Sequence, residues 1–439
     1  MNFVFSKYFF ILLSCGFIAL SLSWNISLVR WIVVGFDLFL ILLALIDYRL
    51  SSLPEEVTIQ REFNKRFAIG DEAEVNLKIE NKSPRSLRII LKDEYPTQMK
   101  LTGGRQGSAY IPSQTTANFF YGLTPTNRGH FEFGKTIVRH LSTLGLVWVQ
   151  SEIRTETAVK VYPNMRRARE IELAALGAKS LVAVNRRAIL RGEGRDFESL
   201  RDYVRGDELR HLSWTATARR GKLVTRQYQI ERDQTVIIAL DAGRLMTGRI
   251  ENETKLDTAI QAALALMSAA ARGGDNVGIL VFGRRIKKFL PPKKGTEQFE
   301  GVLEALHDVE PEMVEPSYPR AFQFISANVK RRSFVVILTD LVDEEGSKEL
   351  LISLKLLRPR HLPLVVTIGD RDLRMVVQDE PNSARSLFTQ SVAEEILFQR
   401  ETALKNVETQ GGLALDVTRR TLAPSLLETY LRVKERGLL

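Results

Sequence analysis

The chain has 439 residues, enough for two or three domains. Hydrophobic residues make up 44% of it, which excludes a disordered chain, and its single cysteine, Cys15, excludes a disulfide framework and a cysteine-ligated metal centre. The net charge of +10 is modest and spread along the chain. It therefore argues against a nucleic-acid-binding protein, in which basic residues gather in one patch.

Residues 1–50 contain two apolar stretches, Tyr8–Leu22 and Leu28–Leu45, joined by a short polar loop. Each is close to the roughly 20 residues that a helix needs to cross a bilayer, which predicts a transmembrane helical hairpin. A cleaved signal peptide is the alternative for the first stretch. The outer flanks carry more basic residues than the loop side, where Arg30, at the start of the second stretch, is the only one. By the positive-inside bias, the soluble domains face the cytoplasm.

Asp37 lies near the middle of the second apolar stretch. A carboxylate inside a membrane is costly and marks a functional position by default. The alternative is a polar contact that holds the hairpin or an oligomer together.

Residues 51–165 carry short segments of alternating polarity, separated by turn-forming sequences. The predicted strands are Val57–Arg61, Ala73–Ile79, Thr116–Tyr121, Thr136–Arg139 and Ala158–Tyr162. This spacing is typical of an immunoglobulin-like β-sandwich. The segment carries no recognisable catalytic chemistry, so we interpret it as a packing module.

Residues 166–230 form a connecting segment rich in arginine and aromatic residues. Phe197, Leu200 and Tyr203 recur at a spacing of three, which predicts a helix with one apolar face. Three roles remain open: a solvated helix with local ion pairs, a nucleic-acid surface, or an interdomain clamp or surface that docks a partner protein. Docking is favoured because acidic residues interrupt the basic ones, and because arginine and aromatic residues dominate binding energies. The proposed partner-binding residues are Arg201, Tyr203, Asp207, Arg210, Trp214 and Arg219, with Trp214 expected to be a buried anchor.

Residues 231–439 alternate between apolar strands and amphipathic helices. The predicted strands are Val236–Leu240, Val277–Phe282, Phe334–Leu338, Leu364–Ile368 and Leu413–Val417. The predicted helices are Lys255–Arg272, Gln298–Leu306, Tyr318–Asn328, Lys348–Leu357, Ser391–Glu408 and Pro424–Arg436. This order predicts a doubly wound α/β domain with a parallel sheet covered on both faces. Ligands of such sheets bind beyond the carboxyl ends of the strands, where Asp241, Asp340 and Asp370 lie.

The arrangement resembles the von Willebrand factor type A fold and, more narrowly, the DUF58 family of membrane-anchored bacterial proteins. The resemblance is carried by Arg128–Gly134, Leu144-Gly145-Leu146, Val161-Tyr162-Pro163, Phe197–Trp214, Ala218-Arg219, Leu240-Asp241 and Gly274–Gly278. It implies a location at the bacterial inner membrane. It also implies an AAA+ ATPase of the MoxR type as a partner.

Type A domains often hold a divalent cation through an Asp-x-Ser-x-Ser motif, a threonine and a second aspartate. Such a site suits Mg²⁺, which prefers oxygen ligands. Asp241 and Asp340 match the two aspartates, and Thr296 is the candidate threonine. Gly243 and Leu245 stand where the motif needs hydroxyls, so the site is degenerate. The alternative is a rim without metal, in which Asp241 and Asp340 accept backbone hydrogen bonds or pair with Arg244.

The residues favour a membrane-anchored scaffold that is not an enzyme and that docks a MoxR-type ATPase or a client protein. A metal-dependent adhesion module is the second hypothesis. A hydrolase that uses the rim carboxylates is the third, and no residue pattern pairs a nucleophile with a base in its support.

Overall fold

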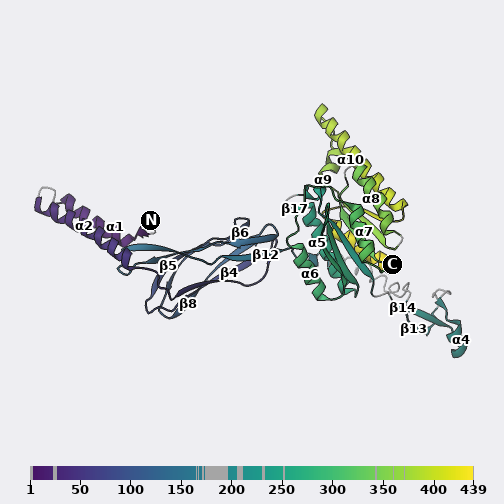
Figure 1. The fold of residues 1–439 in the computed structure, drawn as a ribbon, viewed down its shortest axis with the longest axis horizontal. Helices are drawn as coiled ribbons and strands as arrows, with labels where there is room; N and C mark the ends of the chain where they lie inside the picture. Colours follow the sequence, from purple (N-terminus) through teal and green to yellow (C-terminus); the bar gives the residue numbers. More distant parts are fainter. Residues whose placement is uncertain are drawn as a thin grey trace. The chain divides into compact units, whose positions relative to one another are not determined.

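The computed structural model describes residues 3–22, 27–164, 166, 168–170, 173, 196–204, 211–229, 233–250, 253–341, 344–358, 360–369 and 371–438. The chain divides into two compact units, Met1–Tyr162 and Pro163–Leu439. Figure 1 shows the elements of both units, which are described separately below.

Two apolar helices, α1 (Lys7–Leu22) and α2 (Ser27–Leu50), lie near the N-terminus of the first unit. Among the helices that the structure describes, only α2 is long and apolar enough to cross a membrane, with a mean hydropathy of 2.4 and 17% of its apolar window buried. A helix of this length and composition is typical of a membrane anchor or of a signal sequence. The apolar part of α1, Lys7–Ala19, is shorter than a membrane span. Of the two transmembrane helices predicted from the sequence, one therefore has the length needed to cross a bilayer.

Asp37 of α2 faces Gly16 of α1. A Cβ atom at position 16 would lie 2.5 Å from Asp37 Oδ1, so the glycine leaves room for the carboxylate. Oδ1 itself is buried and has no hydrogen-bond partner among the described residues. The two helices therefore pack around a polar group.

The rest of the first unit is a β-sandwich. Its strands are β1 (Phe3–Phe5), β2 (Val57–Phe63), β3 (Phe67–Ala68), β4 (Ala73–Asn81), β5 (Leu87–Asp93), β6 (Met99–Thr102), β7 (Gln106–Ile111), β8 (Thr115–Pro125), β9 (Gly129–Phe133), β10 (Thr136–Leu141), β11 (Val147–Ile153) and β12 (Thr157–Tyr162). They form sheets of order β1-β11-β10-β5-β7, β2-β4-β8-β6 and β3-β12-β9. The five predicted strands are all present, as parts of β2, β4, β8, β10 and β12.

The strands alternate between buried and exposed side chains, as β4 shows over its whole length. The four-stranded sheet packs against the five-stranded sheet through one apolar cluster, and against the three-stranded sheet through a second one. Each sheet thus has one face in a core, which is the packing expected of a sandwich.

A buried ion pair lies between the sheets. Arg61 Nη2 contacts Asp93 Oδ1 at 2.6 Å, and both side chains are almost fully buried. Asp93 also accepts hydrogen bonds from Tyr121 (2.5 Å) and Thr136 (2.8 Å). The Arg61 guanidinium donates to the carbonyl of Gly134, the last residue of the Arg128–Gly134 motif. That motif therefore helps to satisfy a buried charge.

In the second unit, β13 (Asp196–Asp202), α4 (Trp214–Arg220) and β14 (Val224–Gln229) form a small arm. The two strands pair antiparallel. The helix predicted from Phe197, Leu200 and Tyr203 is therefore wrong. A β-bulge adds one residue between Phe197 and Ser199, and across such a bulge a three-residue spacing can keep side chains on one face of a strand.

The main body of the second unit is a six-stranded sheet. Its strands are β15 (Thr235–Asp241), β18 (Asn276–Phe282), β19 (Ile286–Lys293), β20 (Phe334–Thr339), β21 (Leu362–Gly369) and β22 (Leu413–Thr418). The helices are η3 (Arg244–Thr247), α5 (Lys255–Arg272), α6 (Thr296–Leu306), α7 (Tyr318–Asn328), α8 (Glu344–Leu357), α9 (Arg371–Gln378), α10 (Ala384–Thr409) and α11 (Leu422–Glu435). A short ribbon, β16 (Arg249–Ile250) and β17 (Glu253–Thr254), precedes α5.

The strand order is β19-β18-β15-β20-β21-β22, and all neighbouring pairs except β18–β19 are parallel. Side chains of α7, α8 and α10 cover one face of this sheet, while α5 and α11 pack together on the other (Figure 1). The predicted α/β layering is confirmed in this unit. The edge strand β19 was not predicted, because its lysines and its two prolines suit an exposed edge and break the apolar pattern.

Candidate functional site

The sheet of the second unit places two aspartates at neighbouring strand ends. Asp241 ends β15 and Asp340 directly follows β20, and these two strands are adjacent and parallel. The side chains are 1% and 0% exposed. We call the surroundings of these two carboxylates the rim.

Asp241 accepts hydrogen bonds from neutral donors. The backbone N–H of Gly243 donates to Oδ1 at 2.7 Å, and Thr339 Oγ1 donates to Oδ2 at 2.7 Å. The Thr339 hydroxyl has one proton, which it uses in the bond to Asp241. It therefore accepts the hydrogen bond that it forms with the Tyr318 hydroxyl at 2.9 Å. Burial raises the pKa of Asp241 to about 6, although both hydrogen bonds lower it.

Asp340, in contrast, is held by two cations. Lys255 Nζ, at the start of α5, lies 2.5 Å from Oδ2, and the Arg400 guanidinium of α10 contacts Oδ1. Arg400 is 2% exposed and also donates to the carbonyl of Leu341 at 3.1 Å. Helices from both faces of the sheet thus supply positive charge to one carboxylate.

These residues do not fit a Mg²⁺ ion. A Cβ atom at Gly243 would lie 2.8 Å from Pro316 Cδ and 3.0 Å from the carbonyl oxygen of Val314, so the loop has no space for a hydroxyl side chain there. Both oxygens of Asp340 already contact cations. A metal would have to displace these charges.

Thr296, the predicted third ligand, lies at the opposite edge of the sheet. It begins α6 just after β19, and Lys293 at the end of β19 pairs with Val277 near the start of β18. The unpredicted strand β19 returns the chain to the amino edge of the sheet. The threonine that does contact Asp241 is Thr339, which directly precedes Asp340.

Backbone hydrogen bonds to the rim aspartates, expected for a rim without metal, are present: the N–H groups of Gly243 and Leu341 donate to Asp241 and Asp340. Arg244, the other partner expected in that case, is engaged elsewhere. Its guanidinium contacts Glu315, with Nη2 to Oε1 at 2.7 Å, and its backbone N–H donates to the carbonyl of Val314. The cations at the rim come from Lys255 and Arg400, neither of which was predicted from the sequence. A lysine opening a helix and an arginine inside a 26-residue helix carry no local signal of this role.

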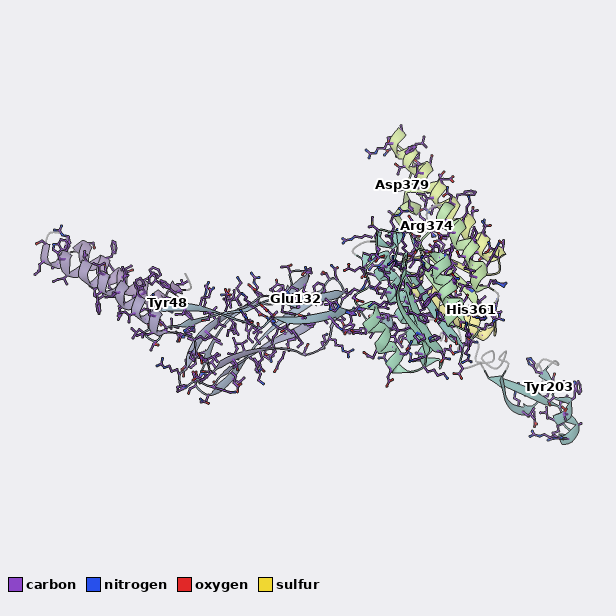
Figure 2. All side chains as sticks on the ribbon, viewed as in Figure 1. Tyr48, Glu132, Tyr203, His361, Arg374 and Asp379 are labelled. Carbon is purple, nitrogen blue, oxygen red and sulfur yellow. The ribbon has the colours of Figure 1, made fainter. Side chains whose placement is uncertain are left out.

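The predicted partner-binding residues that the structure describes lie on the arm. Trp214 begins α4 and is 69% exposed, so the expected buried anchor is wrong. Leu212 and Val224 fill the small core of the arm instead. Arg219 is exposed, and Arg201 and Tyr203 are half-buried (Figure 2 labels Tyr203). Asp207 and Arg210 lie outside the described residues, as does the rim candidate Asp370.

The Gly274–Gly278 motif lies at the amino edge of the sheet and anchors α11. Asp275 is fully buried and accepts hydrogen bonds from Tyr430 (2.5 Å) and Lys434 (2.6 Å). At Gly278, a Cβ atom would lie 2.9 Å from backbone atoms of Leu290 and Pro292. This motif therefore serves packing.

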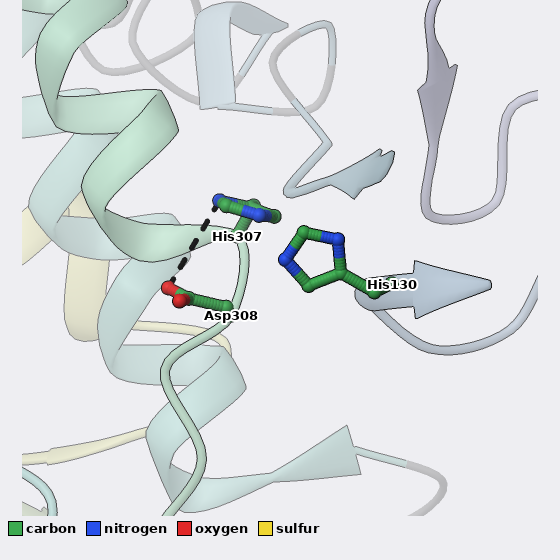
Figure 3. A group of neighbouring side chains, drawn as sticks. All are labelled: His130, His307 and Asp308. Atoms are coloured by element: carbon green, nitrogen blue, oxygen red, sulfur yellow. Dashed lines mark ion pairs between the residues drawn. The ribbon is translucent and has the colours of Figure 1, made fainter. Parts of the chain in front are cut away.

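Figure 3 draws a further group of titratable side chains, His130, His307 and Asp308. His307 Nδ1 lies 3.9 Å from Asp308 Oδ1 and 2.6 Å from the carbonyl oxygen of Glu304, so contacts at the end of α6 engage this ring. His130 belongs to β9 of the first unit.

Residues 199–381 match the model of the protein family DUF58, whose description is 'Protein of unknown function DUF58'. YeaD, an uncharacterized protein of Bacillus subtilis, is 22% identical over 288 residues, which cover 63% of this chain and 68% of YeaD. An uncharacterized protein of Mycobacterium tuberculosis is 23% identical over 190 residues, covering 43% of this chain and 59% of that protein. The matched part thus falls short of two thirds of the mycobacterial relative.

Among solved structures, BatB from Bacteroides thetaiotaomicron matches with a TM-score of 0.31 and 15% identity, over 46% of this chain and 98% of BatB. Proximal thread matrix protein 1 from the mussel byssus matches with a TM-score of 0.27 and 12% identity, over 47% of this chain and 46% of its own. At these TM-scores the likeness adds nothing to the fold described above.

Proposed function

We propose that this protein is a membrane-anchored docking protein without enzymatic activity, whose second unit is von Willebrand factor type A-like. In this proposal α1 and α2 form a transmembrane hairpin at the bacterial inner membrane, and both soluble units face the cytoplasm. The exposed apolar side chains of α2, such as Leu28, Trp31 and Phe39, support the anchor because water would not stabilise them.

The exposed Trp214 is the observation that carries the docking proposal. Tryptophan and arginine are the side chains that most often dominate the binding energy of protein interfaces, and Arg219 and Arg220 lie on the same short helix. Trp214 is 69% exposed, so burying its apolar surface against a partner protein would give a favourable free energy of binding. The partner that we propose is an AAA+ ATPase of the MoxR type, which is the partner that the resemblance of the sequence to DUF58 implies.

The rim supports docking over catalysis. The contacts that hold Asp340 come from Lys255 and Arg400, and those that hold Asp241 come from Gly243 and Thr339. A general acid or base must instead be free to reach a substrate. Because the same contacts occupy both aspartates, they do not favour binding of a partner through Mg²⁺. We therefore expect the melting temperature to stay the same when Mg²⁺ or a chelator is added.

A photo-crosslinking amino acid at position 214 tests the docking proposal in intact cells. We expect it to capture an AAA+ ATPase, identified by mass spectrometry, and we expect Trp214→Ala to reduce co-purification of that ATPase from solubilised membranes. The matched control is the same crosslinker at Tyr110, an exposed aromatic residue of the first unit (63% exposed). Equal capture at both positions, or no ATPase at position 214, would refute the proposal.

The orientation in the membrane is tested separately. Cysteine introduced at exposed Gln106, in a chain carrying Cys15→Ser, should react with an impermeant maleimide only after the inner membrane is opened. Labelling of intact spheroplasts would place the sandwich on the outer side instead.

A further inference from the structure

Asp47, near the end of α2, is bound by a turn of the β-sandwich. It is 2% exposed although it lies at the helix C-terminus, where the helix dipole disfavours negative charge. Ser142 Oγ donates to its carboxylate at 2.5 Å, and the backbone N–H groups of Leu144 and Leu146 donate at 3.1 and 3.3 Å. These charge-assisted bonds fix the turn 142–146 to the end of α2.

The start of α1 binds the same turn. The backbone N–H of Ser6 donates to the carbonyl of Leu146 at 2.8 Å, and its hydroxyl donates to the carbonyl of Gly145 at 2.6 Å. Phe9, Leu40 and Ala44 pack with residues of β11 in one apolar cluster. Both helices and the turn therefore form one joint within the first unit.

The joint between the two helices and the turn 142–146 lies where the apolar stretch of α2 ends. Residues 28–46 span roughly 28 Å at 1.5 Å per residue, close to the roughly 30 Å of a hydrocarbon layer. Leu45 and Ile46 are still 43% and 45% exposed, and Asp47 follows directly. The turn that binds Asp47 is therefore at the height of the lipid headgroups when α2 spans a bilayer.

Leu144 projects from this turn and is 58% exposed, whereas Leu146 on its other side is buried in the joint. Gly145 between them has a φ of +78°, a conformation that glycine adopts without strain. Lys7 and Arg49 are exposed at the adjoining helix ends, where their charges match lipid phosphates. The Leu144-Gly145-Leu146 motif thus buries one leucine and presents the other.

We propose that the turn 142–146 is a membrane-contact loop, in which Leu144 enters the boundary between headgroups and acyl chains of the bilayer that holds α2. The inference rests on the anchoring proposed above. It adds that the β-sandwich has a fixed orientation on the membrane, because Asp47 and Ser6 hold the loop to both helices.

Fluorescence quenching by lipids tests the loop. Single cysteines at positions 31, 144 and 106, in the Cys15→Ser chain, are labelled with bimane in nanodiscs of phosphatidylethanolamine and phosphatidylglycerol with or without doxyl-labelled lipid. Gln106 is the control because its pairing with Lys92 places it at the other end of the same sheet. We expect quenching at position 144 to exceed that at 106 by about twofold or more, as for residues buried in the interface.

Position 31, which is exposed on α2, separates the two proposals. Quenching at 31 without quenching at 144 overturns the membrane-contact loop alone, and no quenching at 31 overturns the anchor. In the Asp47→Asn chain, which loses the charge that binds the turn, we expect quenching at 144 to fall while that at 31 stays. Ser142→Ala removes one hydrogen bond to Asp47 and is the milder variant. It should also lower the quenching at position 144, by a smaller amount.

Discussion

At the scale of single residues, the two rim aspartates show how neighbouring carboxylates acquire different properties. Asp340 is paired with Lys255 and Arg400, whereas Asp241 is stabilised by uncharged donors. The pKa of Asp241 therefore rises from 3.8 to about 6 through burial. The folded state binds the proton of Asp241 more tightly than the unfolded chain does, and this difference sets the sign of its effect on stability.

We predict that Asp241→Asn stabilises the protein at pH 7 and above. Between pH 3.8 and about 6 the charged Asp241 makes folding less favourable as the pH rises, and this cost is complete above pH 6. The variant removes it, so the free energy of unfolding should rise by about 1–3 kcal/mol at pH 8, with no gain at pH 3.5. Urea unfolding at both pH values measures this. Destabilisation at pH 8 would contradict it.

The buried pair of the sandwich gives a second prediction. Asp93→Ala leaves Arg61 buried without its counter-charge, so the first unit should lose about 3–5 kcal/mol. Glu152→Ala is the control, since its pair with Lys135 is exposed and should contribute less than about 1 kcal/mol. Thermal unfolding in detergent compares the two. Similar losses would show that burial of the pair is unimportant.

At the scale of elements, the contact between β18 and β19 depends on Gly278. We predict that Gly278→Ala costs about 1–3 kcal/mol, because the new methyl group would meet backbone atoms of β19, which cannot rotate away. Gly301→Ala in α6 is the control. Its nearest neighbour is the end of the Leu290 side chain at 3.1 Å, and alanine favours a helix, so that change should be neutral or stabilising. Denaturant midpoints of both variants test this.

Elements with a strong local pattern could be predicted from the sequence. The helices Lys255–Arg272 and Tyr318–Asn328 have the predicted bounds, because apolar periodicity and end signals agree there. The strand β13 was mistaken for a helix because a bulge changes the spacing of its apolar residues. Thr296 was assigned to the wrong edge because β19 was missed.

The candidate site was predicted only in part, for a physical reason. Asp241 and Asp340 were found because the ends of neighbouring parallel strands must meet. Lys255, Arg400 and Asp47 act through contacts with residues far away in the chain, and no local pattern indicates such partners. Trp214 was expected to be buried because local sequence does not reveal how little core the arm provides.

At the scale of the whole molecule, α5 and α11 depend on each other. Most residues of α5 are buried, and α11 packs against it while Tyr430 and Lys434 bind Asp275. We predict that a chain ending at Thr421 aggregates, because removal of α11 exposes the apolar residues of α5. The double variant Tyr430→Phe, Lys434→Met should remain soluble but melt at a lower temperature, since α11 is still present. Solubility of the shortened chain would contradict this dependence.

The position of α11 also affects how the protein is made. α5 leaves the ribosome before β18, β20, β21 and β22, yet its last covering helix follows all of them. During translation, the apolar surface of α5 therefore stays exposed until α11 has been made. The sandwich, in contrast, is already complete at Tyr162. We therefore expect such a nascent chain to depend on a chaperone while the second unit is made, whereas its first unit is already able to fold.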